Sequence, residues 1–139
     1  MAVVTKEISL HTRGNCDIVD ITPQVAREVG GASVDNGIVT VFVSGSTAGL
    51  TTIEAEPGLL TDFKAMWERL IPQNLPYEHD RAWHDGNGHS HVRASLLGPS
   101  LVVPFNSKKL DLGTWQQIVL VDFDNRPRSR RLVLQILGE

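Results

Sequence analysis

The chain has 139 residues, of which 41 % are hydrophobic and 21 % charged, a composition typical of one globular domain with its own core. Its 13 basic and 16 acidic side chains give a formal net charge of −3 without a long basic run, which argues against nucleic acid as a partner. Because there is one cysteine, and no apolar stretch is typical of a signal peptide or a membrane span, we expect a cytoplasmic protein without a membrane partner.

The first half of the chain is predicted to combine strands with one short helix. Residues 6–11 alternate polar and apolar side chains, as a half-buried strand does. A helix is expected over 22–30, with Thr22 as its N-cap, proline at its first position and glycine at its exit. The β-branched run at 37–43 predicts a strand buried on both faces, and residues 50–54 are also β-prone.

The second half begins with the clearest helical pattern. Over 57–70, large apolar side chains recur every three or four residues with charged residues between them, and Pro72 ends the pattern. A further helix is expected to begin near 87–89 and to end where Gly98 and a proline follow. Six or seven strands with three helices predict a single α+β domain over residues 1–139. The remaining strands are expected at 101–104, 115–123 and 131–137.

Four of the five histidines lie in one short stretch, interleaved with aspartates. Imidazole and carboxylate groups bind transition metals and move protons near neutral pH, so this stretch is the expected centre of the chemistry. A divalent metal is predicted, with zinc the most natural ion and magnesium the second candidate. The alternative is a surface loop whose histidines only hydrogen-bond to neighbouring carboxylates. The polar residues of the stretch are His79, Asp80, His84, Asp85, Asn87, His89 and His91.

The secondary structure around His89 and His91 decides whether both can bind one metal. In a strand, residues two apart share a face, whereas in a helix they stand about 200° apart. Because the cap signals favour a helix, His91 is predicted as the leading ligand and His89 as a looser second one. His79 and Asp85 are expected to arrive from the preceding loop.

Two segments are candidates for binding a phosphate. Asn87 and Gly88 lead into the predicted helix, where free backbone N–H groups and the helix dipole favour an anion. The loop at 43–49 carries three hydroxyls and two glycines and includes Ser46 and Thr47, but it lacks the lysine of a P-loop. The alternatives are an ordinary N-cap at Asn87 and a plain tight connection at 43–49.

Glu54 and the residues around Trp115 are further candidates. If Glu54 is buried, it needs a metal or arginine partner, or its pKa rises and it becomes a general acid or base. The alternative is an exposed carboxylate near a helix start. Thr114, Trp115 and Gln116 place a hydroxyl, an indole and an amide together, although tryptophan is more often a core residue than a ligand platform. The basic turn at 126–131 is either an anion site or a solvated hairpin tip.

Four segments of the chain match the motifs of a known family. They are GSTAGLTTIE at 45–54, YEHD at 77–80, SHVRASLLGPS at 90–100 and LGTWQQI at 112–118. Together they resemble the YjbQ family, also called the secondary thiamine-phosphate synthase enzyme family, over nearly the whole chain. The resemblance implies a compact, sandwich-like or barrel-like α+β domain rich in antiparallel strands, and assembly as a homotrimer. It also implies a metal such as zinc in a histidine-lined pocket and a weak thiamine phosphate synthase activity.

The resemblance further implies which residues act. Many relatives have histidine where this chain has Gly45, so a ligand or acid is absent at that position. The additional His84 and His89 could compensate for it. The positions that match the family are Glu54, His79, Asp80, His91 and the turn at 113–116.

We therefore expect a synthase that joins hydroxymethylpyrimidine diphosphate to thiazole phosphate and releases pyrophosphate. A cation, a helix N-terminus and hydroxyl donors would stabilise the charge on the leaving group. The alternatives are a non-catalytic trimeric protein that binds a metal or phosphorylated metabolite, and a metal-dependent hydrolase of a small phosphorylated molecule with Glu54 as base. In the synthase hypothesis, the metal ligands are His79, His91 and either His89 or Asp85; phosphate lies at Ser46, Thr47, Asn87 and Gly88; substrate contacts Thr114, Trp115 and Gln116; and Glu54 orients a group or transfers a proton.

Overall fold

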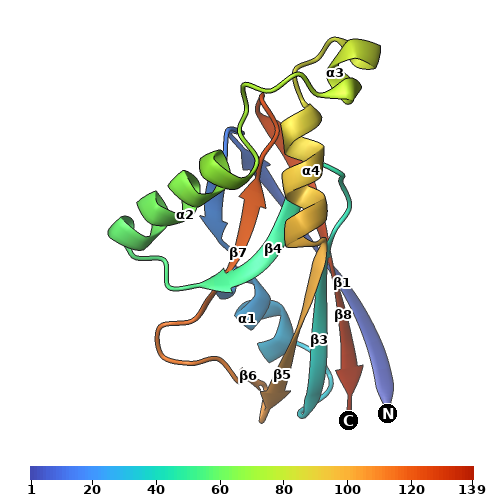
Figure 1. The fold of residues 1–139 in the computed structure, drawn as a ribbon. Coiled ribbons are helices and arrows are strands. Elements are labelled where there is room, and N and C mark those ends of the chain that lie inside the picture. The colour runs from blue at the N-terminus through green and yellow to red at the C-terminus, as the bar shows by residue number, and fades with distance from the viewer.

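Two antiparallel sheets form the framework, and helices cover the smaller one (Figure 1). The computed structural model describes all 139 residues. In spatial order the larger sheet consists of β1 (Ala2–Thr12), β8 (Arg128–Gly138), β3 (Gly37–Val43), β5 (Ser100–Asn106) and β6 (Lys109–Leu110). The smaller sheet consists of β2 (Asp17–Asp20), β7 (Gln117–Asp122) and β4 (Ala48–Ile53). The helices are α1 (Thr22–Gly30), α2 (Pro57–Leu70), α3 (Glu78–Trp83) and α4 (Gly88–Leu97). The expected α+β class with antiparallel sheets is confirmed.

The middle strand of the smaller sheet, β7, is buried on both faces and divides the interior into two cores. Successive side chains of a strand point to opposite faces. Ile118 and Leu120 therefore belong to the core between the sheets, and Val119 belongs to the core under the helices. Phe123 continues the second row and packs edge-on against Trp67 of α2, with ring centroids 4.9 Å apart. One apolar row thus holds the helical layer to the smaller sheet.

β3 is buried on only one face, so the prediction of a strand buried on both faces is wrong. Its valines, Val39, Val41 and Val43, point into the core. Ile38 and Phe42 are exposed on the outer face of the larger sheet. The physical reason is that the helices pack on the smaller sheet or between the sheets, so no helix covers that outer face (Figure 1).

The predicted helices at α1, α2 and α4 are confirmed, but their caps differ from expectation. Thr22 lies inside α1 rather than at its N-cap, and its hydroxyl accepts a hydrogen bond from the N–H of Ile118 at 2.8 Å. The N–H of Thr22 donates to Oδ1 of Asp20 at 2.9 Å instead. α2 is capped by the carboxylate of Glu56, which accepts from two N–H groups of the first turn. None of the helices combines the length and apolarity that a membrane crossing needs.

Three short elements, β2, α3 and β6, were not expected from the sequence. β2 has four residues and β6 has two, too few for a hydrophobic period to show. α3 has six residues and replaces the loop that was expected around His79. Its first turn carries Glu78 and Asp80, and acidic residues favour a helix N-terminus, so this signal could have indicated it.

Cys16 is buried beneath the helical layer, and its thiol is expected to be unreactive in the native protein. It is 6 % exposed and belongs to the same core as Trp67 and Phe123. Burial raises the pKa of the Cys16 thiol to about 11, so at pH 8 only about one molecule in a thousand carries the reactive thiolate. Ellman's reagent should therefore react about 100-fold more slowly in buffer than in guanidinium chloride. Equal rates under the two conditions would contradict this burial.

Candidate functional site

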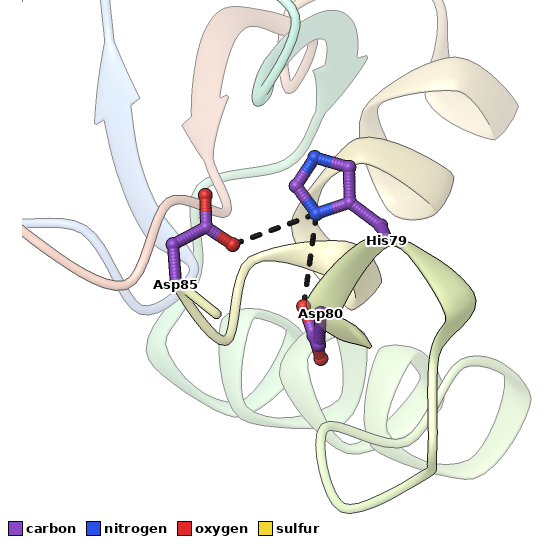
Figure 2. A group of neighbouring side chains, drawn as sticks. All are labelled: His79, Asp80 and Asp85. Carbon is purple, nitrogen blue, oxygen red and sulfur yellow. Dashed lines mark ion pairs between the residues drawn. The ribbon is translucent and has the colours of Figure 1, made fainter. Parts of the chain in front are cut away.

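α3, the loop that follows it and the first turn of α4 bring two histidines and two aspartates together, and α3 lies at one end of the molecule (Figure 1). The ring centroids of His79 and His91 lie 4.4 Å apart. Nδ1 of His79 lies 3.7 Å from Oδ1 of Asp80 and 3.5 Å from Oδ1 of Asp85 (Figure 2). This nitrogen is buried and makes no hydrogen bond. A buried polar atom without a partner is costly, so its position between two carboxylates is typical of a binding atom.

The cluster has the chemistry and spacing of a metal site. The ligand atoms of His79, Asp80 and Asp85 all lie within 4.8 Å of one another. A single cation with bonds of about 2.0–2.2 Å reaches ligands up to about 4.4 Å apart, and the distances from Nδ1 of His79 to the two carboxylate oxygens, 3.7 and 3.5 Å, lie within that limit. One imidazole and two carboxylates suit zinc, and carboxylates also suit magnesium. The cluster contains two of the four predicted ligands, His79 and Asp85, and adds Asp80.

Backbone N–H groups at the start of α4 hold both carboxylates. The N–H of Gly88 donates to Oδ1 of Asp80 at 2.8 Å, and the N–H of Asn87 donates to Oδ1 of Asp85 at 3.1 Å. Position 88 has no room for a side chain, because a Cβ there would lie 2.5 Å from Cβ of Tyr77. The amides that were predicted to bind a phosphate therefore hold the protein's own carboxylates.

His91 lies between this cluster and a hollow of about 230 Å³. Ser46 lines the same hollow from the loop between β3 and β4, together with Gly45 and Ser95. The Ser46 side chain is exposed. The fold therefore brings a predicted metal ligand and a predicted phosphate-binding residue to one place, although they are far apart in the sequence.

The other two histidines of the stretch have different surroundings. His89 is 2 % exposed, and its Nδ1 has no hydrogen-bond partner. Burial, and after it the charge of Arg93, lowers the pKa of His89 and favours a neutral imidazole. His84 is exposed and ends α3 in the left-handed conformation, with φ of 53°. The structure thus brings His79 and His91 together and leaves His84 and His89 outside the cluster.

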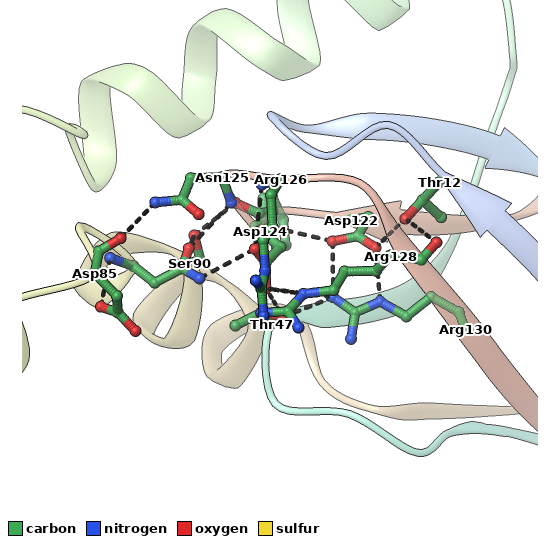
Figure 3. A network of polar contacts seen from close by, with 12 residues as sticks. Thr12, Thr47, Asp85, Ser90, Asp122, Asp124, Asn125, Arg126, Arg128 and Arg130 are labelled. Atoms are coloured by element: carbon green, nitrogen blue, oxygen red, sulfur yellow. Dashed lines mark hydrogen bonds and ion pairs between the residues drawn. The ribbon is translucent and has the colours of Figure 1, made fainter. Parts of the chain in front are cut away.

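Thr47 and Asn87 belong to a buried polar network that centres on Asp124 (Figure 3). Oδ2 of Asp124 accepts hydrogen bonds from Oγ1 of Thr47 and Nε of Arg128, both at 2.9 Å. Oδ1 accepts from Nδ2 of Asn87 at 3.1 Å. Burial alone raises the pKa of Asp124, but these hydrogen bonds outweigh it and hold the pKa below its usual value. Thr47 and Asn87, which were predicted to bind phosphate, therefore already have hydrogen-bond partners within the chain.

A buried ion pair between Asp122 and Arg130 lies beside this network (Figure 3). Nε and Nη2 of Arg130 donate to the two carboxylate oxygens of Asp122 at 2.6 and 2.8 Å, a bidentate arrangement. Arg130 also limits the neighbouring loop, because a Cβ at Gly45 would lie 2.7 Å from its Nη1. The prediction of a solvated hairpin tip is wrong for Arg130, which is only 8 % exposed. The reason is that β7 and β8 belong to different sheets and do not form a hairpin.

Glu54 and Trp115 lie away from the histidines within the chain. β4 begins at Ala48, beside the hollow of His91, and Glu54 follows its far end. Six residues at about 3.3 Å each place Glu54 about 20 Å farther along the strand. Glu54 is exposed and lines a separate hollow of about 400 Å³ with Trp115, so the condition for a buried acid is not met. Trp115 is 70 % exposed, and its interpretation as a core residue is wrong.

The turn that carries Trp115 is held by the amide of Gln116. Its Oε1 accepts from the N–H of Gly113 at 3.0 Å, and its Nε2 donates to Oγ1 of Thr52 at 3.1 Å. Gln116 lines a third hollow, of about 380 Å³, between β4 and β5. Thr114 is exposed. Thr114, Trp115 and Gln116 thus face solvent, as ligand-binding residues would, but they do not line the hollow of His91.

The acidic half of the buried network was missed from the sequence. Asp122 and Asp124 alternate with Phe123 at the end of the buried strand, and four arginines follow within seven residues. Opposite charges so close in sequence could have indicated pairing. The basic turn carried a prediction and the two aspartates did not, because a buried strand is expected to carry apolar side chains.

Residues 6–139 match the family described as UPF0047 protein YjbQ-like. The chain belongs to this family. A UPF0047 protein of Archaeoglobus fulgidus is 43 % identical over 131 residues, which cover 94 % of this chain and 99 % of the relative. The UPF0047 protein of Methanothermobacter thermautotrophicus is 37 % identical over 139 residues, which cover 100 % of this chain and 95 % of the relative.

Solved structures of similar proteins share the fold. A protein of unknown function from Sulfolobus solfataricus superposes with a TM-score of 0.92 at 35 % identity, and the match covers 99 % of each chain. A UPF0047 protein of Clostridium acetobutylicum gives 0.86 at 34 % identity, covering 95 % of this chain and 99 % of the other. The descriptions of these relatives name the family and no reaction. The activity of this UPF0047 protein therefore has to be argued from its site.

Proposed function

We propose that this UPF0047 protein is a metal-dependent transferase of the thiamine phosphate synthase type. It would join hydroxymethylpyrimidine diphosphate to thiazole phosphate and release pyrophosphate. The observation that supports this most strongly is the buried Nδ1 of His79, which makes no hydrogen bond and lies between the carboxylates of Asp80 and Asp85. His91 links this cluster to a hollow that Ser46 also lines. A cation and a phosphate can therefore lie side by side.

In this reaction the thiazole nitrogen forms a bond to the methylene carbon of the pyrimidine. The bond between that carbon and pyrophosphate breaks, and its electron pair leaves with pyrophosphate. A divalent cation supplies stabilisation of this developing negative charge. His79, Asp80 and Asp85 would hold the cation, for which zinc is proposed and magnesium is the second candidate. His91 contacts the His79 ring and faces the hollow, so we assign it to complete the ligand set.

The proposed phosphate site is the hollow between Ser46 and His91. Of the four residues first expected to bind phosphate, Ser46 alone retains this role, because its side chain faces the hollow. The side chains of Thr47 and Asn87 already bind Asp124. The N–H of Gly88 already donates to Asp80. These three residues support the walls of the site instead of contacting the ligand.

Glu54 and the turn of Thr114, Trp115 and Gln116 do not reach the histidines within one chain, so their proposed substrate contacts require a second subunit. The family resemblance implies a homotrimer. The outer face of the larger sheet exposes Phe42 and other apolar residues, as a subunit interface would. Light scattering of the purified protein should give three times the chain mass of 15.3 kDa. A monomer would leave Glu54 without its proposed role.

Pyrophosphate release from purified, metal-loaded protein tests the proposal against its alternatives. A synthase releases pyrophosphate only when both substrates are present. A metal-dependent hydrolase releases phosphate or pyrophosphate from one substrate alone, and a non-catalytic binding protein releases neither. Release with a single substrate, or none with both, would contradict the synthase proposal. The hydrolase alternative expects Glu54 as its base. Within one chain Glu54 lies too far from the cluster for that role.

A further inference from the structure

We propose that Asn87 and Asp124 form a positioning pair that sets the metal affinity of the site by fixing the N-terminus of α4. This inference rests on the proposed metal site. Neither residue is placed to touch a metal or a substrate, because Asn87 is 4 % exposed and Asp124 is fully buried. Their effect must therefore pass through the groups that they hold.

The backbone around Asn87 holds the two carboxylates of the metal cluster. Its own N–H donates to Oδ1 of Asp85, and the next N–H, that of Gly88, donates to Oδ1 of Asp80. The carbonyl oxygen of Asn87 also accepts from the N–H of His91 at 3.2 Å. One residue thus connects the backbone to three members of the proposed site, and a shift of this residue would move all three.

The side chain of Asn87 is in turn held by three hydrogen bonds to the protein. Its Nδ2 donates to Asp124, while its Oδ1 accepts from the N–H of Asn125 at 3.1 Å and from Oγ of Ser90 at 2.7 Å. The single hydroxyl proton of Ser90 is shared with the carbonyl oxygen of Phe123, which lies 2.6 Å from Oγ. The turn after β7 therefore determines where the N-terminus of α4 lies.

Asp124 itself cannot move easily. Thr47 and Arg128 donate to its Oδ2, and the N–H of Arg126 donates to its Oδ1 at 3.2 Å (Figure 3). These donors come from β8 and from the segment before β4 as well as from the turn. The carboxylate therefore ties the α4 N-terminus to both sheets, and groups that orient metal ligands in this way typically change affinity about 10–100-fold when altered.

The exchange of amide and carboxylate between the two positions tests the proposal. Asn87→Asp replaces the amide donor, so that two buried carboxylates face each other. Asp124→Asn replaces the carboxylate acceptor, so that two amide groups face each other. The double variant N87D/D124N restores one donor and one acceptor between the two positions, but it loses the bond from the N–H of Arg126 and the charge that pairs with Arg128. We expect each single variant to raise the Kd for cobalt(II) about 10–100-fold and to shift its visible absorption bands. The double variant should recover most of the affinity and the wild-type spectrum.

Melting temperatures measured with chelator present separate positioning from stability. A single variant that melts lower but binds cobalt(II) with the wild-type Kd and spectrum would overturn the positioning role. So would a double variant that regains its melting temperature without regaining affinity. If wild-type protein binds no cobalt(II), the proposed metal site itself fails, whereas normal wild-type binding with unaffected variants defeats only this inference.

A milder variant covers the case in which the single variants do not fold. Nδ2 of Asn125, in the exposed part of the same turn, donates to the carbonyl oxygen of Asp85 at 2.6 Å. Asn125→Ala removes this bond and keeps the backbone contact to Asn87. We expect the cobalt(II) Kd to rise about fivefold, the effect of one hydrogen bond. An unchanged Kd would overturn the proposal. Thr61→Ala is the matched control, because it removes an exposed hydrogen bond to the carbonyl oxygen of Pro57 in α2, outside the metal cluster. It should bind cobalt(II) as wild type does.

Discussion

Replacing His79 with alanine is expected to lower the affinity for zinc by at least about 100-fold, because groups that merely support a ligand are already worth about 10–100-fold. The variant loses the nitrogen that lies within 4 Å of the carboxylates of both Asp80 and Asp85. Those carboxylates would then face each other without an imidazole between them. His91→Ala should likewise lose bound metal and pyrophosphate release. Metal content measured by atomic emission, together with a pyrophosphate assay, checks both expectations.

His84→Asn is the matched control for these variants. His84 belongs to the same histidine-rich stretch but is exposed and lies outside the ligand cluster. Its φ of 53° is a left-handed value that asparagine tolerates well. Its metal content and turnover should equal those of wild type. If His79→Ala retains both metal and rate, the chemistry does not take place at this cluster.

Arg130→Met is expected to have the largest effect on stability, about 3–5 kcal/mol. The substitution leaves the fully buried carboxylate of Asp122 without its bidentate partner and removes a donor to Thr47. An uncompensated charge in the interior is costly because the surroundings cannot solvate it. Thermal unfolding followed by circular dichroism should show a melting temperature about 10–15 °C below wild type.

Two further variants show whether the loss comes from the unpaired charge. D122L/R130M removes both charges, and its melting temperature should lie well above that of Arg130→Met alone. Arg131→Met removes the neighbouring arginine, whose partner Glu7 is on the exposed face of β1. It should change the melting temperature much less, because solvent can replace an exposed pair. Equal losses at positions 130 and 131 would show that burial of the pair does not matter.

The composition of the site could be predicted better than its geometry. Histidines and aspartates are chemically distinct from ordinary loop residues, so their density at 77–91 predicts a metal site. Which of them converge could not be predicted, because this depends on the unexpected helix α3 and on its contact with α4 at Gly88. The phosphate candidates show the same limit. Thr47 and Ser46 are adjacent and chemically alike, yet one is buried against Asp124 and the other faces the hollow.

By itself the sequence determined the helices over 22–30, 57–70 and 88–97 and most of the strands, because the period of apolar residues and the cap residues are local properties. It also determined where histidines and aspartates are concentrated. Only the tertiary structure decided that β3 has an open face, that His89 is buried while His91 meets His79, and that Asn87 binds Asp124. These outcomes depend on packing between segments distant in the chain, such as those of Asn87 and Asp124, which are 37 positions apart. No local pattern encodes which elements meet.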